Sequence, residues 1–99
     1  MLIRSQDKTI IVNIDNAFSI AIRDINGAAS IYVGSQGSCC IIAEYSTKAK
    51  AMKVLGMIQD AYSEYQIMLN FSVSYLHEFK EKTDGFAIFQ MPEDSEVVV

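Results

Sequence analysis

The sequence predicts an α+β protein in which an antiparallel β-meander sheet of five to six strands is packed by one long α-helix. Runs of β-branched residues and runs of alternating polarity fill the first 45 residues, as in a series of strands. Asn26-Gly27, a strong signal for a tight hairpin turn, lies between two of these runs. From Ala51 to Leu69, apolar residues recur every three or four positions, which indicates an amphipathic helix. The length of 99 residues fits a single domain over 1–99.

Two strands are expected at the start of the chain. Met1–Arg4 is short and apolar, and the segment 5–8 has the composition of a turn that Asp7 can close by accepting a hydrogen bond from nearby backbone. Thr9–Ile14 is β-branched almost throughout. It therefore predicts a well-buried strand.

Three further strands continue the meander. Over 18–23, large apolar residues alternate with the small or polar residues Ser19, Ala21 and Arg23, as in a half-buried strand. The Asn26-Gly27 turn is expected to connect this strand to Ala28–Val33. A hairpin loop over 34–38 then leads to Cys39–Tyr45.

The helix that follows is capped at its N-terminus by Ser46 or Thr47. Its apolar stripe, wide enough to cover one face of the sheet, consists of Ala51, Val54, Leu55, Ile58, Ala61, Tyr62, Tyr65 and Leu69. Met52, Met57 and Met68 flank this stripe and extend the apolar surface beyond what one sheet face needs. We therefore expect a homo-oligomer, in which another copy of the chain buries the excess.

The last third of the chain is less regular. Residues 71–84 fit both a strand and a helical turn, and we expect a short helix or an irregular excursion. Gly85–Met91 predicts a final strand that stops at Pro92, because proline cannot donate a hydrogen bond to a sheet. Residues 93–99 begin with an acidic run and predict a flexible acidic tail.

The net charge of −4 is unevenly distributed. Residues 1–53 carry six bases against four acids, whereas residues 54–99 carry two bases against eight acids. The acidic total disfavours binding to long nucleic acid, which requires a basic surface that releases counterions. The basic first half leaves a small anionic ligand possible. No apolar run is long enough to span a bilayer, and Arg4 and Asp7 interrupt the place of a signal peptide, so a cytoplasmic protein is expected.

The sequence gives little support for catalysis or for metal binding. His77 is the sole histidine, and no nucleophile motif accompanies it. Cys39 and Cys40 are adjacent, so on a strand their side chains point to opposite faces and a disulfide between them would be strained. We expect one of these thiols to be buried and the other to face solvent. Accordingly we predict a non-enzymatic protein with no metal site and no cofactor.

Three segments resemble a known group of proteins. They are Leu2–Lys8, the helix entry Glu44–Ala51 with its continuation Val54–Gln59, and Phe89–Pro92. In this order they are similar to small proteins of phages and prophages of Firmicutes. The resemblance implies a binding protein that counters host antiviral defence in the bacterial cytoplasm.

Within that context, sequestration of a nucleotide immune signal is the leading hypothesis. Such a protein needs arginine or lysine for the phosphates and tyrosine or phenylalanine for the base. The candidate ligand-binding residues are Arg4, Lys8, Tyr45, Lys48, Lys50 and Phe89. Arg4 and Phe89 would lie close together if the first and last strands pair. Lysines at the start of the helix would also attract an anion, because the helix dipole is positive at this end.

Two alternatives stay open. A direct inhibitor of a host defence protein, similar to an anti-CRISPR protein, would use an acidic face to mimic nucleic acid. Its candidate residues are Asp60, Glu64, Glu78, Glu81 and Glu93. A structural or regulatory prophage protein is the other possibility.

Overall fold

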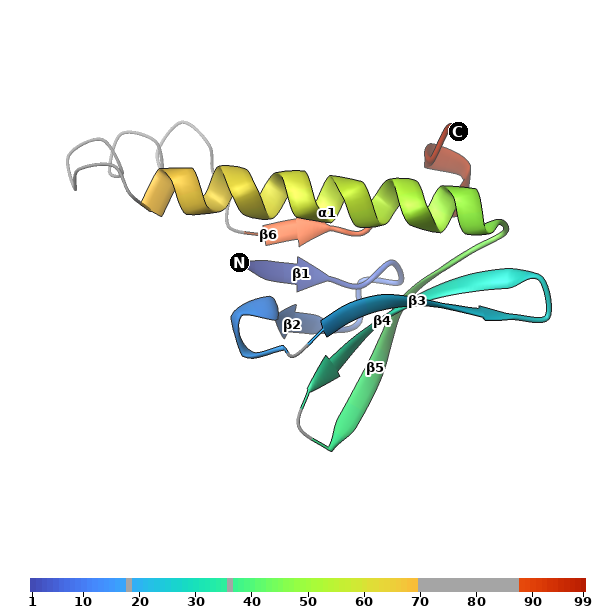
Figure 1. Ribbon diagram of the computed structural model, residues 1–99, viewed down its shortest axis with the longest axis horizontal. Helices are drawn as coiled ribbons and strands as arrows, with labels where there is room; N and C mark the ends of the chain where they lie inside the picture. Colours follow the sequence, from blue (N-terminus) through green and yellow to red (C-terminus); the bar gives the residue numbers. More distant parts are fainter. Residues whose placement is uncertain (18, 36, 70–87) are drawn as a thin grey trace.

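The computed structural model describes residues 1–17, 19–35, 37–69 and 88–99. These residues form strands, one long helix and two short 3-10 helices, arranged as shown in Figure 1. In chain order the elements are β1 (Leu2–Arg4), β2 (Ile11–Asn13), η1 (Ile14–Asn16), β3 (Ser19–Ile25), β4 (Ala28–Ser35), β5 (Ser38–Tyr45), α1 (Lys48–Leu69), β6 (Ile88–Gln90) and η2 (Asp94–Glu96). The predicted excursion over 71–84 lies outside the described residues.

The α+β class with one long helix is confirmed, but the single sheet of five to six strands is wrong. The strands form two sheets of three, ordered β2-β1-β6 and β3-β4-β5, which we call the terminal sheet and the meander sheet. The meander sheet is antiparallel, whereas the terminal sheet is mixed because β6 runs parallel to β1. The turn η1 at Ile14–Asn16 separates β2 from β3, so the meander begins a new sheet instead of extending the first.

The two hairpins of the meander sheet lie where the sequence predicts them. Asn26 and Gly27 have φ angles of 53° and 84°, as the predicted two-residue hairpin turn requires. The second hairpin is tighter than expected, because β4 runs to Ser35 and β5 starts at Ser38. A β-bulge leaves Ile42 as the extra residue of β5, since Ile31 pairs with Ala43 while Tyr32 pairs with Ile41.

The prediction of a well-buried strand over Thr9–Ile14 is also wrong. The strand β2 has three residues and lies at the edge of the terminal sheet. Ile10 and Ile11 remain 39% and 55% exposed, and only Val12 and Ile14 pack against the core. A continuous run of β-branched residues does not reveal that one side of its strand faces solvent.

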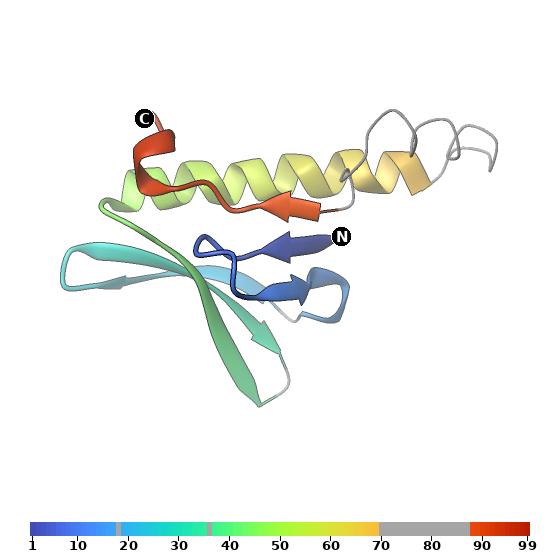
Figure 2. The same cartoon turned by 180° about the vertical axis from the view of Figure 1, so that it is seen from behind.

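The helix covers the meander sheet, and it lies along one side of the molecule (Figures 1 and 2). Thr47 caps it, because its side-chain oxygen accepts a hydrogen bond of 3.2 Å from the Lys50 amide. The buried core joins both sheets, the helix and the C-terminal segment. It comprises Met1, Ile3, Ala29, Ile31, Val33, Ile42, Ala43, Tyr45, Ala51, Val54, Ile58, Met91 and Val97.

The C-terminal segment differs from the flexible acidic tail expected over 93–99. Its residues 94–96 form η2, and Glu93 and Glu96 make reciprocal hydrogen bonds across this turn. Val97 is 5% exposed and belongs to the core, while Val98 and Val99 are 73% and 74% exposed. The segment folds back over the start of the helix, as Figure 2 shows, because Val97 gains burial there.

Candidate functional site

A tightly bonded turn connects β1 to β2. The Lys8 amide donates to the Ser5 carbonyl oxygen at 2.9 Å. One carboxylate oxygen of Asp7 accepts three hydrogen bonds, from the Ser5 hydroxyl at 2.7 Å, the Thr9 amide at 3.0 Å and the Thr9 hydroxyl at 2.6 Å. The bonds from Thr9 and Ser5 lower the pKa of Asp7 to about 2. These hydrogen bonds stabilise a turn in which Lys8 adopts a left-handed φ of 67° without being glycine.

This turn brings the side chain of Arg4 to the backbone of Lys8 at one end of the terminal sheet. The Nε and Nη2 atoms of Arg4 both donate to the Lys8 carbonyl oxygen at 3.3 Å. Both side chains are exposed. Within the described part of the chain, neither side chain forms an ion pair. We refer to Arg4 and Lys8 as the turn cluster.

Beside the turn cluster, one side of the terminal sheet faces solvent. The strand registers place six side chains on this open face: Leu2, Arg4, Ile11, Asn13, Ile88 and Gln90. Ile11 and Ile88 are 55% and 44% exposed, whereas Ile3, on the opposite face, is fully buried. The open face therefore joins an exposed aliphatic surface to a guanidinium group.

Phe89 lies on the other side of the same sheet. The first and last strands do pair, with Ile3 opposite Phe89 and Arg4 opposite Gln90. Because side chains alternate along a strand, the Phe89 ring follows Ile3 toward the core, against which it packs. The pairing therefore brings the backbones of Arg4 and Phe89 together but leaves their side chains on opposite faces.

The start of α1 is bound by the chain's own C-terminal segment. One carboxylate oxygen of Asp94 accepts hydrogen bonds from the Ser46 amide at 2.8 Å and the Ser46 hydroxyl at 3.1 Å. The Nζ atom of Lys50 lies 3.4 Å from the other carboxylate oxygen of Asp94 and donates to its backbone carbonyl at 3.0 Å. The bonds from Ser46, together with the charge of Lys50, lower the pKa of Asp94.

The three lysines Lys48, Lys50 and Lys53, which we call the helix-start cluster, thus differ in their surroundings. Lys53 donates to the Val98 carbonyl oxygen, and Lys50 is paired with Asp94. Lys48 is exposed. The chain itself therefore places one carboxylate, that of Asp94, beside Ser46 and Lys50 at the helix start.

Tyr45 has a structural role in the same region. Its side chain is 2% exposed, and its hydroxyl donates to the Pro92 carbonyl oxygen at 2.7 Å. Burial raises the pKa of Tyr45, and the charges of Asp94 and Glu96 raise it further. The side-chain amide of Gln6 also donates to the Pro92 carbonyl oxygen, at 3.2 Å. Tyr45 therefore anchors the C-terminal segment and offers no free ring face.

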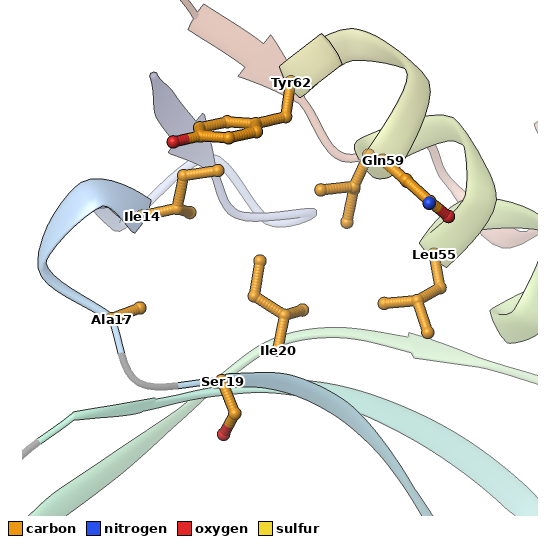
Figure 3. A pocket seen from close by; sticks show the side chains of 8 residues that line it. Ile14, Ala17, Ser19, Ile20, Leu55, Gln59 and Tyr62 are labelled. Atoms are coloured by element: carbon orange, nitrogen blue, oxygen red, sulfur yellow. The ribbon is translucent and has the colours of Figure 1, made fainter. Parts of the chain in front are cut away.

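An open groove of about 420 Å³ lies between α1 and the start of β3 (Figure 3). Its lining residues are Ile14, Ala17, Ser19, Ile20, Leu55, Ile58, Gln59 and Tyr62. The Tyr62 hydroxyl is 3.4 Å from a carboxylate oxygen of Asp15, whose other oxygen pairs with the N-terminal amine of Met1 at 3.1 Å. The described residues that line it include no lysine or arginine, so the groove suits an uncharged group better than a phosphate.

Several other predicted features can be located. Cys39 is exposed and Cys40 is partly buried, and both are free thiols, in agreement with side chains on opposite faces of β5. His77, Glu78 and Glu81 lie outside the described residues.

In the described ranges, no group of three His, Cys, Asp or Glu side chains could hold a metal ion. No helix in these ranges is long and apolar enough to cross a membrane.

The aliphatic part of the open face was missed at the level of sequence. Ile11 belongs to an apolar run, and Ile88 lies in a predicted strand. Neither pattern shows which of its side chains face solvent. Only the register against Arg4 and Leu2 shows that both point outward. Comparisons of the chain with protein-family models, curated proteins and solved structures gave no match.

Proposed function

We propose that this chain is a non-enzymatic binding protein that holds a small anionic nucleotide on the open face of the terminal sheet. The resemblance to phage and prophage proteins gives this activity its biological role, the sequestration of a host nucleotide immune signal. One observation carries the proposal: Arg4 and Lys8 are exposed, make no ion pair within the described part of the chain, and adjoin an aliphatic surface.

The chemistry of the open face matches the two parts of a nucleotide. A guanidinium has five N–H donors in a planar fork that binds phosphate oxygens in pairs. The Lys8 carbonyl oxygen engages Nε and Nη2 of Arg4 and orients the group, while Nη1 has no hydrogen-bond partner among the described residues. Exposed Ile11 and Ile88, on the two strands that flank β1, offer apolar surface against which one face of a base would lose its contact with water.

The helix-start cluster is a less suitable phosphate site than the turn cluster, because two of its lysines already contact the C-terminal segment. Lys50 and Lys53 are engaged by the C-terminal segment, and Asp94 brings its own negative charge to the helix start. A phosphate at this position would have to displace a carboxylate that already accepts two hydrogen bonds from Ser46. The turn cluster requires no such displacement.

Calorimetric titration of the chain with cyclic nucleotides and ADP-ribose derivatives tests the proposal. We expect saturable binding to at least one compound, and Arg4→Ala should weaken it by about 1.5–3 kcal/mol, the usual contribution of a hydrogen bond to a charged group. Lys48→Ala is the matched control, since it removes an exposed cation from the helix-start cluster and should leave the affinity unchanged. Absence of binding heat across the panel would overturn the proposal.

A further inference from the structure

The side of α1 that faces away from the sheets carries exposed apolar residues. Met52 and Ile67 are 54% and 58% exposed there, and Met57, on a flank of the helix, is 39% exposed. A helix that packs by one face onto a sheet usually has a polar opposite face. Met52 and Ile67 lie on one line along that outer face, about four turns apart, with Gly56 and Ser63 between them.

This outer face is complementary to itself when two helices run antiparallel. A two-fold axis passing between Gln59 and Asp60 places Met52 of one copy opposite Ile67 of the other, at both ends of the contact. The same axis places Gly56 opposite Ser63. No atom lies within 4 Å of the position where a Cβ on Gly56 would be, so a second backbone can approach closely there.

The charges along the helix favour the same antiparallel arrangement. The N-terminal half of α1 carries Lys48, Lys50 and Lys53, whereas its C-terminal half carries Asp60 and Glu64. Antiparallel packing brings Lys53 of one copy beside Glu64 of the other. It also places the positive end of each helix dipole beside the negative end of the other, which is favourable. Asp60 of each copy lies nearest the axis, where the two like charges repel.

From these observations we propose that the outer face of α1 is a homodimer interface, in which the helices of two copies pack antiparallel through Met52, Gly56, Ser63 and Ile67. The occupant of this face is a second copy because the apolar pairs and the charge pairs both match under one two-fold axis. The interface uses none of the six residues of the open face of the terminal sheet. It is therefore independent of the proposed ligand site.

Sedimentation equilibrium over a range of protein concentrations tests the interface. The native chain should approach twice its mass of 11.0 kDa, and Ile67→Lys should raise the dimer Kd by about tenfold or more, because it removes one apolar anchor from each end of the contact. Ile41→Lys is the matched control, because Ile41 is 48% exposed on β5 and should leave the Kd unchanged. Circular dichroism melting confirms that both variants fold. A native chain that stays monomeric, or dissociation by Ile41→Lys alone, overturns the proposal.

Charge variants test the register of the interface. Glu64→Lys should raise the dimer Kd by about threefold, the usual size for an exposed ion pair, and a second change, Lys53→Glu, should restore it. Asp60→Asn should lower the Kd by removing the repulsion at the axis. A double variant that dimerises more weakly than Glu64→Lys, or an Asp60→Asn variant that dissociates, contradicts the antiparallel register.

Discussion

Two basic regions of this protein differ in what their cations contact. At the start of α1, Lys50 pairs with Asp94 and Lys53 donates to the Val98 carbonyl oxygen. At the turn between β1 and β2, Arg4 contacts a neutral carbonyl group, and both Arg4 and Lys8 remain exposed. The two regions are similar in sequence, since each combines closely spaced bases with hydroxyl residues.

The difference lies in a contact that crosses half of the chain. The C-terminal segment provides the helix start with a carboxylate, so this basic region stabilises the fold. The turn cluster receives no such partner from the described residues, and its rigid turn holds Arg4 beside an aliphatic face. Charge density alone therefore does not identify a binding site, because the counterion can come from the chain itself.

The largest effect on the helix-start side is expected from the buried residue of the C-terminal segment. Val97→Ala should lower the free energy of unfolding by about 1.5–3 kcal/mol, since it removes two buried methyl groups and leaves a cavity. Val98→Ala is the control, because Val98 is 73% exposed. Urea unfolding monitored by circular dichroism measures both. Equal stabilities of the two variants would show that the segment does not dock onto the core.

A smaller loss is expected when the anchor of this segment is shortened. Tyr45→Phe removes the hydrogen bond from the buried hydroxyl to the Pro92 carbonyl oxygen and should lower the free energy of unfolding by about 1 kcal/mol. Tyr62→Phe should have less effect, since the Tyr62 hydroxyl lies 3.4 Å from its acceptor on Asp15. The same urea experiment compares them. A larger loss for Tyr62→Phe would contradict the anchoring role of Tyr45.

The stability of the folded protein should depend on pH through Asp7, whose carboxylate closes the turn between β1 and β2. Its pKa falls to about 2 in the folded protein, below the ordinary value of about 3.9, so its charged form favours folding above pH 4. This contribution is lost as the pH falls from about 4 to about 2. Asp7→Asn should therefore be less stable at neutral pH and should lose less stability on acidification. Parallel stability curves for both proteins would indicate that the turn does not hold the carboxylate.

The smallest change is expected at Lys48. This exposed cation lies in the first turn of α1, where it opposes the helix dipole. Lys48→Ala should raise the free energy of unfolding by a few tenths of a kcal/mol, about the lower range for a charge near a helix end. Thermal melting at low salt is the suitable measurement. A clear decrease in the melting temperature would mean that Lys48 has a stabilising partner.

Local patterns in the sequence predicted the local structures well. The apolar spacing of α1 and the Asn26-Gly27 turn are both present in the structure, since each depends on neighbouring residues alone. The division into two sheets could not be predicted in this way, because it depends on how η1 redirects the chain after β2. The docked C-terminal segment was missed for a related reason: Asp94 meets Ser46 across a separation of 48 residues.

The sequence predicted the residue types of the candidate site but not the directions of their side chains. Arg4 and Lys8 could be identified as cations, and the pairing of the first and last strands was expected. The facing direction of Phe89 could not be derived, because it depends on the register of β6 against Ile3. The same register decides that Ile11 and Ile88 point outward. Residue types were thus available from the sequence, whereas the assembly of these residues into a surface required the three-dimensional pairing.

The most direct test of the account is an NMR titration of the isotopically labelled chain with the nucleotide that calorimetry identifies. Amide shifts should concentrate on β1, β2, the turn that connects them, and β6, where the open face and the turn cluster lie. The amides from Ser46 to Lys53 should remain unchanged, since Asp94 already occupies the helix start. Shifts centred on Ser46, Lys50 and Asp94, with none on Arg4 or Lys8, would contradict the account.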